Sequence, residues 1–174
     1  MSWNQDLFKT TLDFATQAHG EQKVPGSGFP YVTHLVKVAT EVLRAADGTF
    51  DVDLAMQCAL LHDSVEDAGV NVDDLAARFG ERVARGVAAL TKNESLPKEQ
   101  QMNDSLMRIR QQPREVWMVK LADRITNLEP APHYWTAEKK QKYRVEAQEI
   151  VDALGEAHAG LSARIRQKIA AYQT

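Results

Sequence analysis

Apolar residues recur along most of the chain at intervals of three and four, the spacing of amphipathic helices. The pattern predicts helices over residues 4–18, 31–46, 52–67, 72–79, 81–90, 97–111, 113–128 and 136–171. Asp51, Asn71 and Thr136 stand where helix N-caps are expected, and the last helix could break near Gly155 or Gly160. No stretch has the convincing alternation of a strand. The sequence therefore predicts an all-α bundle of roughly eight helices.

Two connections between these helices are predicted to be loops. Residues 21–30 are rich in glycine and proline, which exclude a helix. Residues 91–101 form the most polar connection in the chain, and we expect most of them to be solvated. The sharper alternative for this second loop is a lid that carries Lys92 or Lys98 toward a phosphate.

The third predicted helix changes character near its end. Its apolar run gives way to His62, Asp63, Glu66 and Asp67 within six residues. Residues four apart share a helix face, so an imidazole and three carboxyl groups would lie together at the edge of the core. An ordinary helix end, stopped by Gly69, explains the same pattern equally well. Residues elsewhere in the chain must decide between the two interpretations.

Two other helices carry polar residues among apolar ones. His34 lies on the apolar face of the second helix, where a buried histidine is more often a packing residue than a ligand. The seventh helix has a broad apolar surface and one polar stripe, formed by Lys120, Asp123, Arg124 and Asn127. A solvated face has the same spacing, but the wide apolar surface favours a largely buried helix. The charges of such a helix need partners.

Four of these residues could bind one metal ion. His34, His62, Asp63 and Asp123 offer two imidazoles and two carboxylates, a suitable ligand set for a divalent cation of intermediate hardness. Adjacent side chains of a regular helix diverge by about 100 degrees. His62 and Asp63 can therefore serve one ion only at a helix end or kink, which is where we expect the site.

Glu66 and Asp67 lie one helical turn beyond this pair, beside the predicted ion rather than bound to it. A carboxylate in that place can take a proton from an attacking water or orient it, which is the general-base step of metal-assisted hydrolysis. We therefore expect an enzyme. The alternative, a module that senses a nucleotide without turning it over, has no need of such a pair.

Composition and charge narrow the setting. The formal charge is -3 and the pI is near 6.0, so there is no global basic field that would attract nucleic-acid polymers. The single Cys58 cannot form an internal disulfide, and no apolar stretch is long enough for a signal sequence or a membrane span. We expect a cytoplasmic protein with no membrane partner, whose anionic substrate meets local positive charge or a metal.

The order of these residues resembles the HD-domain phosphohydrolase superfamily, and within it the RelA/SpoT-type hydrolases of the alarmone (p)ppGpp. The shared motifs are Tyr31-x-x-His34, His62-Asp63-x-x-Glu66-Asp67 and Val119-Lys-Leu-Ala-Asp123-Arg-x-x-Asn127-Leu. The resemblance covers about residues 12–150. It implies one ion, usually Mn²⁺, held by His34, His62, Asp63 and Asp123. It also implies that Glu66 and Asp67 activate the water that releases the 3′-pyrophosphate.

Three further features favour this branch of the superfamily. No histidine lies between His62 and Asp123, so the extra ligands of the two-metal HD phosphodiesterases are missing. The related 5′-nucleotidases carry the glutamate but lack an aspartate that matches Asp67. A chain of 174 residues cannot also hold the synthetase and regulatory domains of the long enzymes. We expect one domain over residues 1–174, similar to the small alarmone hydrolases.

The resemblance also suggests residues that meet a guanosine polyphosphate. Lys120, Arg124 and Asn127 fall at positions that support the site or its substrate. Tyr143 resembles a tyrosine that contacts the base or the ribose, although an aromatic residue at helical spacing is also typical of a core.

The loop before Tyr31 departs from the family pattern. Many alarmone hydrolases carry there an Arg-Lys pair that contacts the nucleotide, whereas those places here hold Val24 and Pro25, with Lys23 nearby. The loss of two cations should weaken the binding of a polyanion, because charge-assisted hydrogen bonds are worth about 1.5 to 3 kcal/mol each. Another phosphorylated nucleotide is therefore the alternative substrate.

Overall fold

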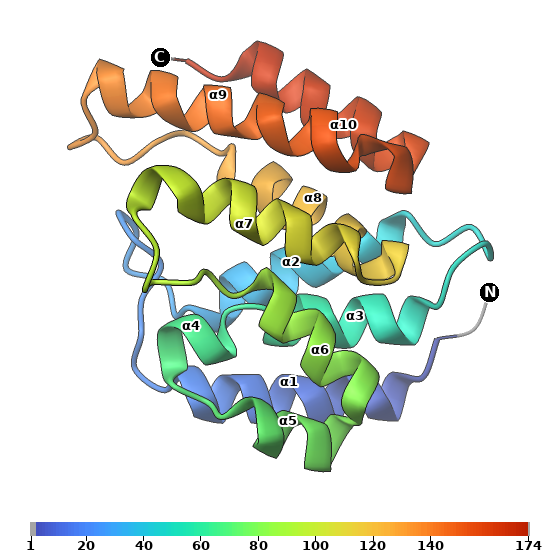
Figure 1. Ribbon diagram of the computed structural model, residues 1–174. Coiled ribbons are helices and arrows are strands. Elements are labelled where there is room, and N and C mark those ends of the chain that lie inside the picture. The colour runs from blue at the N-terminus through green and yellow to red at the C-terminus, as the bar shows by residue number, and fades with distance from the viewer. Residues whose placement is uncertain (1–2, 174) are drawn as a thin grey trace.

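The structure, a computed structural model, describes residues 3–173 as a bundle of helices (Figure 1). The helices are α1 (Gln5–His19), α2 (Val32–Arg44), α3 (Val52–Leu61), α4 (Ser64–Ala68), α5 (Val72–Phe79), α6 (Glu81–Leu90), α7 (Lys98–Arg110), α8 (Arg114–Asn127), α9 (Ala137–Leu154) and α10 (Ala159–Ala171), with a 3₁₀ turn, η1 (Gly155–Ala157). Within this range the one strand-like feature is an isolated bridge between Lys23 and Pro30, and no helix is both long and apolar enough to cross a membrane. The predicted all-α fold is confirmed.

Two of the predicted helices are divided, so the bundle has more than the expected eight helices. The helix predicted over residues 52–67 stops at Leu61 and restarts at Ser64. The Ser64 hydroxyl donates to the Leu61 carbonyl at 2.6 Å, a side-chain bond in place of a regular helical one. The carboxy-terminal run breaks at Gly155, one of the two expected places. After it, His158 caps α10 by accepting a hydrogen bond from the backbone N–H of Leu161.

Side chains cap several helices where the sequence predicted them. Asp51, Asn71 and Thr136 each accept a hydrogen bond from a backbone N–H in the first turn of α3, α5 and α9. At the other end of α4, Gly69 adopts a left-handed conformation with a φ of 66°, which glycine allows without steric cost. These local signals fix the boundaries of the helices that carry the site.

α3 is the central helix of the bundle, and every residue from Leu54 to Leu61 is buried. It packs against α1, α2, α6 and α8, while α9 and α10 lie together at the opposite side of the molecule from α1 and α5 (Figure 1). α8 is also largely buried, as its broad apolar surface predicted. Because α2, α3 and α8 also contact one another, polar residues on their facing sides are brought to one place.

Candidate metal centre and its pocket

Three helices bring His34, His62 and Asp123 together at one buried point. One donor atom from each lies within 4.8 Å of the other two. Nε2 of His34 is 3.4 Å from Nε2 of His62 and 3.5 Å from Oδ1 of Asp123. The three residues are between 4% and 7% exposed, so water screens their mutual interactions only weakly.

Asp63, the fourth predicted ligand, lies beside both imidazoles. Its Oδ2 is 2.8 Å from Nε2 of His62 and 3.7 Å from Nε2 of His34. The same oxygen accepts a hydrogen bond of 2.6 Å from the hydroxyl of Tyr31. The adjacent side chains of His62 and Asp63 converge because the regular helix stops at this pair, which is the geometry that one shared ion requires.

The donors at this point fit a divalent cation. Nδ1 of His62 donates to the carbonyl of Ala59 at 2.8 Å, so the Nε2 lone pair of the neutral ring faces the cluster. Donors bound to one ion at about 2.1 Å lie roughly 3 Å apart. The measured separations between the imidazole nitrogens and carboxylate oxygens run from 2.8 to 3.8 Å. Two nitrogen and two oxygen donors suit an ion of intermediate hardness.

The electrostatics of the cluster also favour a cation. Burial alone would lower the pKa of His62, but the carboxylates of Asp63 and Asp123 raise it to about 9. Burial would raise the pKa of Asp63, but His62 lowers it to about 2. Burial likewise opposes ionisation of Asp123, yet Lys120 and the two histidines hold its pKa well below the usual range. The cluster is thus a buried point that stabilises positive charge.

Two residues of the polar stripe on α8 hold the Asp123 carboxylate. The Asn127 amide donates to its Oδ1, and the Lys120 ammonium lies 3.3 Å from its Oδ2. Both residues lie within one turn of Asp123, so the helix itself sets their reach. In this structure they orient a candidate metal ligand, and they also line the pocket beside it.

Arg124 and Tyr143 form another wall of that pocket. The Arg124 guanidinium lies 4.0 Å from the centre of the Tyr143 ring and 3.5 Å from a carboxylate oxygen of Glu146. Burial raises the pKa of the Tyr143 hydroxyl. Tyr143 is therefore a partly buried residue that packs against the hydrophobic core and also lines the pocket.

Glu66 and Asp67 lie on α4, beside the cluster, and each is held by a loop residue. Lys92 engages both oxygens of Glu66, with its backbone N–H at 3.0 Å from Oε2 and its ammonium at 2.5 Å from Oε1. The amide of Gln22 donates to Oδ2 of Asp67 at 2.9 Å. Sequence reasoning placed Lys92 only near a phosphate and overlooked Gln22. No periodic signal marks either contact, because each joins a helix to a distant loop.

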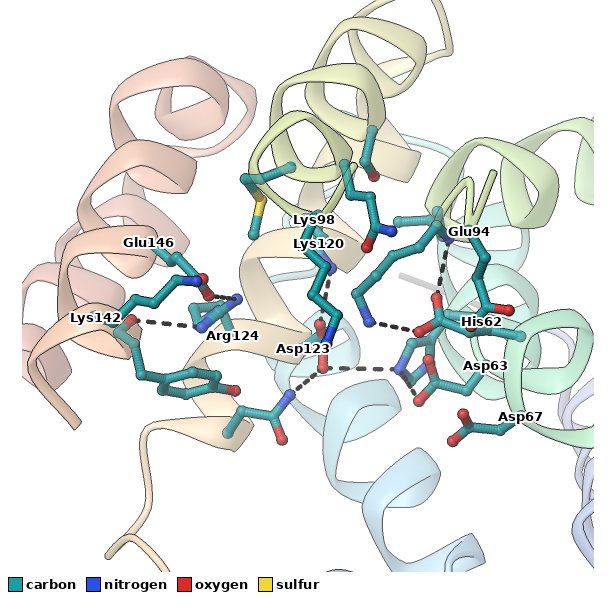
Figure 2. Close-up of a pocket in the computed structure, with 18 of the residues that line it drawn as sticks. His62, Asp63, Asp67, Glu94, Lys98, Lys120, Asp123, Arg124, Lys142 and Glu146 are labelled. Atoms are coloured by element: carbon teal, nitrogen blue, oxygen red, sulfur yellow. Dashed lines mark hydrogen bonds and ion pairs between the residues drawn. The ribbon is translucent and has the colours of Figure 1, made fainter. Parts of the chain in front are cut away.

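A pocket of about 520 Å³ opens beside the cluster (Figure 2). Five cations line it: Lys92, Lys98, Lys120, Arg124 and Lys142. Three of them pair with carboxylates, whereas Lys98 and Lys142 form no ion pair with any residue that the structure describes. Figure 2 shows Lys142 on the far side of the pocket from His62 and Asp63. Lys98 and Lys142 are thus the two lining cations of the described chain that no carboxylate neutralises.

A second pocket, of about 470 Å³, shares Asn127 and Tyr143 with the first. Prolines, Val24 and Trp135 make much of its wall. The hydroxyls of Thr126 and Tyr172 also belong to its lining residues, and neither has a hydrogen-bond partner within residues 3–173. Both hydroxyl oxygens are buried, so the surface that this pocket presents is mainly apolar.

The structure does not bring Lys23, a predicted substrate residue, to either pocket. Its backbone pairs with Pro30 in the isolated bridge, and its ammonium lies 4.0 Å from a carboxylate oxygen of Glu21. The neighbouring Val24 and Pro25 do line the second pocket. The family's Arg-Lys positions are therefore at a pocket wall, and here they carry no charge.

Comparisons with known proteins agree with this geometry. The family profile of the HD domain matches residues 11–158. The guanosine-3′,5′-bis(diphosphate) 3′-pyrophosphohydrolase MESH1 of Danio rerio is 32% identical over 162 residues, which cover 90% of this chain and 89% of the relative. The Homo sapiens protein of the same name is 33% identical over 150 residues, covering 82% of this chain and 81% of the relative.

Solved structures give the same picture. One described as a metazoan ortholog of SpoT that hydrolyses ppGpp has a TM-score of 0.84 and 27% identity, covering 98% of this chain and 97% of that chain. A Listeria monocytogenes protein with a TM-score of 0.63 and 22% identity shares the fold. Both chains are matched over most of their length, so the resemblance is not confined to the motifs.

Proposed function

The chain belongs to the HD domain family, and from this premise we propose that it is a metal-dependent hydrolase of (p)ppGpp or a close relative. One observation carries the proposal: Glu66 and Asp67 stand beside a largely buried cluster of two histidines and two aspartates, in a pocket lined with cations. Relatives that align with most of the chain are named as ppGpp 3′-pyrophosphohydrolases, which supports the same substrate.

The ion would be held by His34, His62, Asp63 and Asp123. We propose Mn²⁺, the metal that the family resemblance implies, although nearly any such donor set binds several divalent cations. When bound, the ion supplies positive charge that polarises a phosphoryl oxygen and makes a water molecule more acidic. Lys120 and Asn127 would keep Asp123 in place for this role.

The protein's own groups carry the proton transfer. A carboxylate of the Glu66–Asp67 pair takes a proton from water, and the water oxygen forms a bond to the phosphorus next to the 3′ oxygen. The bond between that phosphorus and the 3′ oxygen breaks, and the 3′ oxygen takes up a proton. The products are pyrophosphate and a nucleotide that has a free 3′ hydroxyl and keeps its 5′ phosphates. Lys92 keeps the Glu66 carboxylate oriented throughout.

The two pockets suggest how the substrate lies. Lys98 and Lys142 can take phosphate oxygens, since neither is paired with a carboxylate among the described residues. The second pocket can take a nucleoside, with Trp135 offering an apolar surface for the base. A nucleotide in this orientation would span the cluster.

A second candidate keeps the metal and the carboxylates and changes the nucleotide. Val24 and Pro25 favour it, because they line the second pocket where a polyanion would be better met by cations. A phosphorylated nucleotide with fewer charges near this wall would lose less binding free energy when Val24 and Pro25 stand in place of two cations.

Product analysis separates these functions. The metal-stripped protein is reconstituted with Mn²⁺ and incubated with ppGpp and with a panel of phosphorylated nucleotides, and the products are resolved by ion-exchange chromatography. Pyrophosphate from ppGpp supports the first function, and orthophosphate from another nucleotide supports the second. Tight nucleotide binding without any product would instead indicate a sensing module. The Glu66→Gln variant and the metal-free protein are the controls.

A further inference from the structure

His19 is buried at a helix end that would ordinarily be solvated. It is the last residue of α1, where a basic side chain interacts well with the helix dipole. Yet the residue is only 5% exposed. Burial of a polar ring costs free energy unless the ring forms compensating interactions. The position of His19 therefore calls for a second reason.

The first interaction of His19 leads to the carboxylate pair. Its Nδ1 lies 2.7 Å from Oε1 of Gln22, whose Nε2 donates to Oδ2 of Asp67. An ionised carboxylate only accepts hydrogen bonds, so the amide nitrogen of Gln22 must face Asp67 and its oxygen must face His19. Nδ1 of His19 therefore carries the hydrogen. Nε2 is buried and has no hydrogen-bond partner among the described residues.

The second interaction of His19 leads to the metal cluster. Its ring stacks on the ring of Tyr31, with centroids 4.9 Å apart and planes 24° from parallel. The hydroxyl of Tyr31 donates to the Asp63 carboxylate at 2.6 Å. The backbone N–H of Tyr31 also donates to the carbonyl of Gln22, so the loop between α1 and α2 closes against the histidine.

We propose that His19 is a positioning residue for the hydrolytic site. It fixes the amide of Gln22, which orients Asp67, and it supports the ring of Tyr31, which orients Asp63. Asp67 needs such help, because its side chain is exposed and Gln22 is the one side chain of the described region that hydrogen-bonds to it. This role rests on the proposed function, in which Asp67 helps to activate water.

Two substitutions break the hydrogen-bond path from His19 to Asp67 and leave an aromatic ring stacked on Tyr31. Gln22→Leu keeps the size of the side chain and removes the amide, while His19→Phe keeps the stacked ring and removes the Nδ1–H. We expect each variant to lower kcat about tenfold and to leave the KM for the nucleotide and the Mn²⁺ affinity within about twofold of the wild-type values. Gln17→Leu, the same substitution on an exposed residue of α1, is the matched control and should change neither constant.

A double-mutant cycle tests whether Gln22 acts through Asp67. In an Asp67→Asn background, Gln22→Leu should lower kcat by much less than it does in the wild-type background, because the group that it positions is already disabled. An equal loss of kcat in both backgrounds would overturn the proposal. Thermal unfolding of each variant establishes that the comparison is made on folded protein.

The tautomer of His19 gives a readout that does not depend on activity. In the ¹⁵N-labelled full chain, the shift of Nδ1 should be that of a ring nitrogen that carries a hydrogen, and Gln22→Leu should lower the fraction of rings in that form. A wild-type ring whose Nδ1 carries no hydrogen contradicts the proposal, whatever nucleotide the enzyme hydrolyses. Failure of the proposed substrate is distinguishable, because the kinetic comparison can then use any nucleotide that the panel shows to be turned over.

Discussion

The metal cluster and the carboxylate pair beside it are built in different ways. The cluster takes its side chains from α2, α8 and the end of α3, three helices that pack against one another in the core. Glu66 and Asp67 stand on the five-residue α4, and each is held by a side chain from a loop. Helix packing thus fixes the cluster, whereas hydrogen bonds from two loop residues, Lys92 and Gln22, orient the pair.

The difference extends to the solvent. The side chains of His34, His62 and Asp123 are 4% to 10% exposed, whereas those of Asp63 and Glu66 are 20% and 18% exposed. Asp67 lies on the surface. Charges interact more strongly where water is excluded. A rigid buried cluster can hold an ion in one geometry, while a more accessible pair can meet water and release a proton. We expect substitutions in the cluster to abolish metal binding, and substitutions around the pair to lower turnover while metal binding is kept.

The largest effect is expected from the cluster itself. His62→Ala or Asp123→Ala should remove Mn²⁺ binding, measured by isothermal titration, and lower turnover by roughly a thousandfold or more, since a bound ion contributes several kcal/mol. Asp13→Ala, on an exposed face of α1, is the control and should keep both properties. Undiminished Mn²⁺ affinity in the two cluster variants would show that the ion binds elsewhere.

Substitutions in the pair should separate turnover from metal binding. Glu66→Gln and Asp67→Asn keep the shape of each side chain and remove its basicity, so we expect turnover to fall about 10² to 10⁴-fold with Mn²⁺ affinity retained. Turnover is measured by pyrophosphate release from ppGpp, and metal affinity by the same titration as above. Full activity in both variants would contradict the assignment of the general base to this pair.

The pH dependence of metal binding tests the electrostatics of the cluster. In the metal-free protein His62, with a pKa of about 9, keeps its proton at neutral pH. The ion needs the lone pair that this proton occupies, so binding releases the proton. The apparent Mn²⁺ affinity should therefore rise about tenfold per pH unit below pH 9 and level off above it. Affinity that stays constant between pH 6 and about 8 would show that no such proton is displaced.

The sequence predicted the helices from local regularities, and it predicted the cluster from the types and order of residues that resemble the HD-domain family. Apolar spacing and capping residues such as Asp51 located the helices. A kink at His62 and Asp63 is expected because their adjacent side chains must converge on one ion. Apolar spacing alone, however, predicts one unbroken helix over residues 52–67. The break itself depends on the Ser64 hydroxyl binding the Leu61 carbonyl, a contact that periodicity does not contain.

The partners of the carboxylate pair could not be predicted in this way. Gln22 is 45 positions from Asp67, and Lys92 is 26 positions from Glu66. Both contacts depend on the path of a loop, which apolar spacing does not determine. The same reason explains why Lys23 looked suitable for the substrate and lines neither pocket, since one step along the loop turns a side chain away.

Removing the side chain that orients Glu66 should lower kcat less than removing the charge of Glu66 itself. Lys92→Met leaves the backbone N–H bond to Glu66 and deletes the ammonium, so we expect kcat to fall about 10- to 100-fold, the range found for groups that orient an active-site residue. Lys92→Arg should restore part of the loss. In a Glu66→Gln background the added effect of Lys92→Met should nearly vanish. Equal losses in both backgrounds would mean that Lys92 does not act through Glu66.

A lysine variant far from the pocket is the control for Lys92→Met. Lys9 pairs with Asp6 at 3.0 Å on the exposed side of α1, and Lys9→Met should leave kcat unchanged. Hydrogen exchange adds a readout without substrate, because the backbone amide of Lys92 is protected by Glu66. Glu66→Ala should therefore speed the exchange of that amide, and exchange at the wild-type rate would contradict the contact.

The smallest effects are expected from the two pocket lysines that pair with no carboxylate of the described chain. Lys98 and Lys142 are exposed and unpaired within the described chain, so they are free to follow a phosphate but also well screened by water. Lys98→Met or Lys142→Met should raise the KM for ppGpp about two- to fivefold, the scale of an exposed ion pair, and leave kcat unchanged. The rise should shrink at high salt, whereas the loss in Lys92→Met should persist, because Lys92 acts within the protein. A fall in kcat for both the Lys98 and Lys142 variants would instead give these lysines a part in positioning, and would remove the distinction between paired and unpaired cations of the pocket.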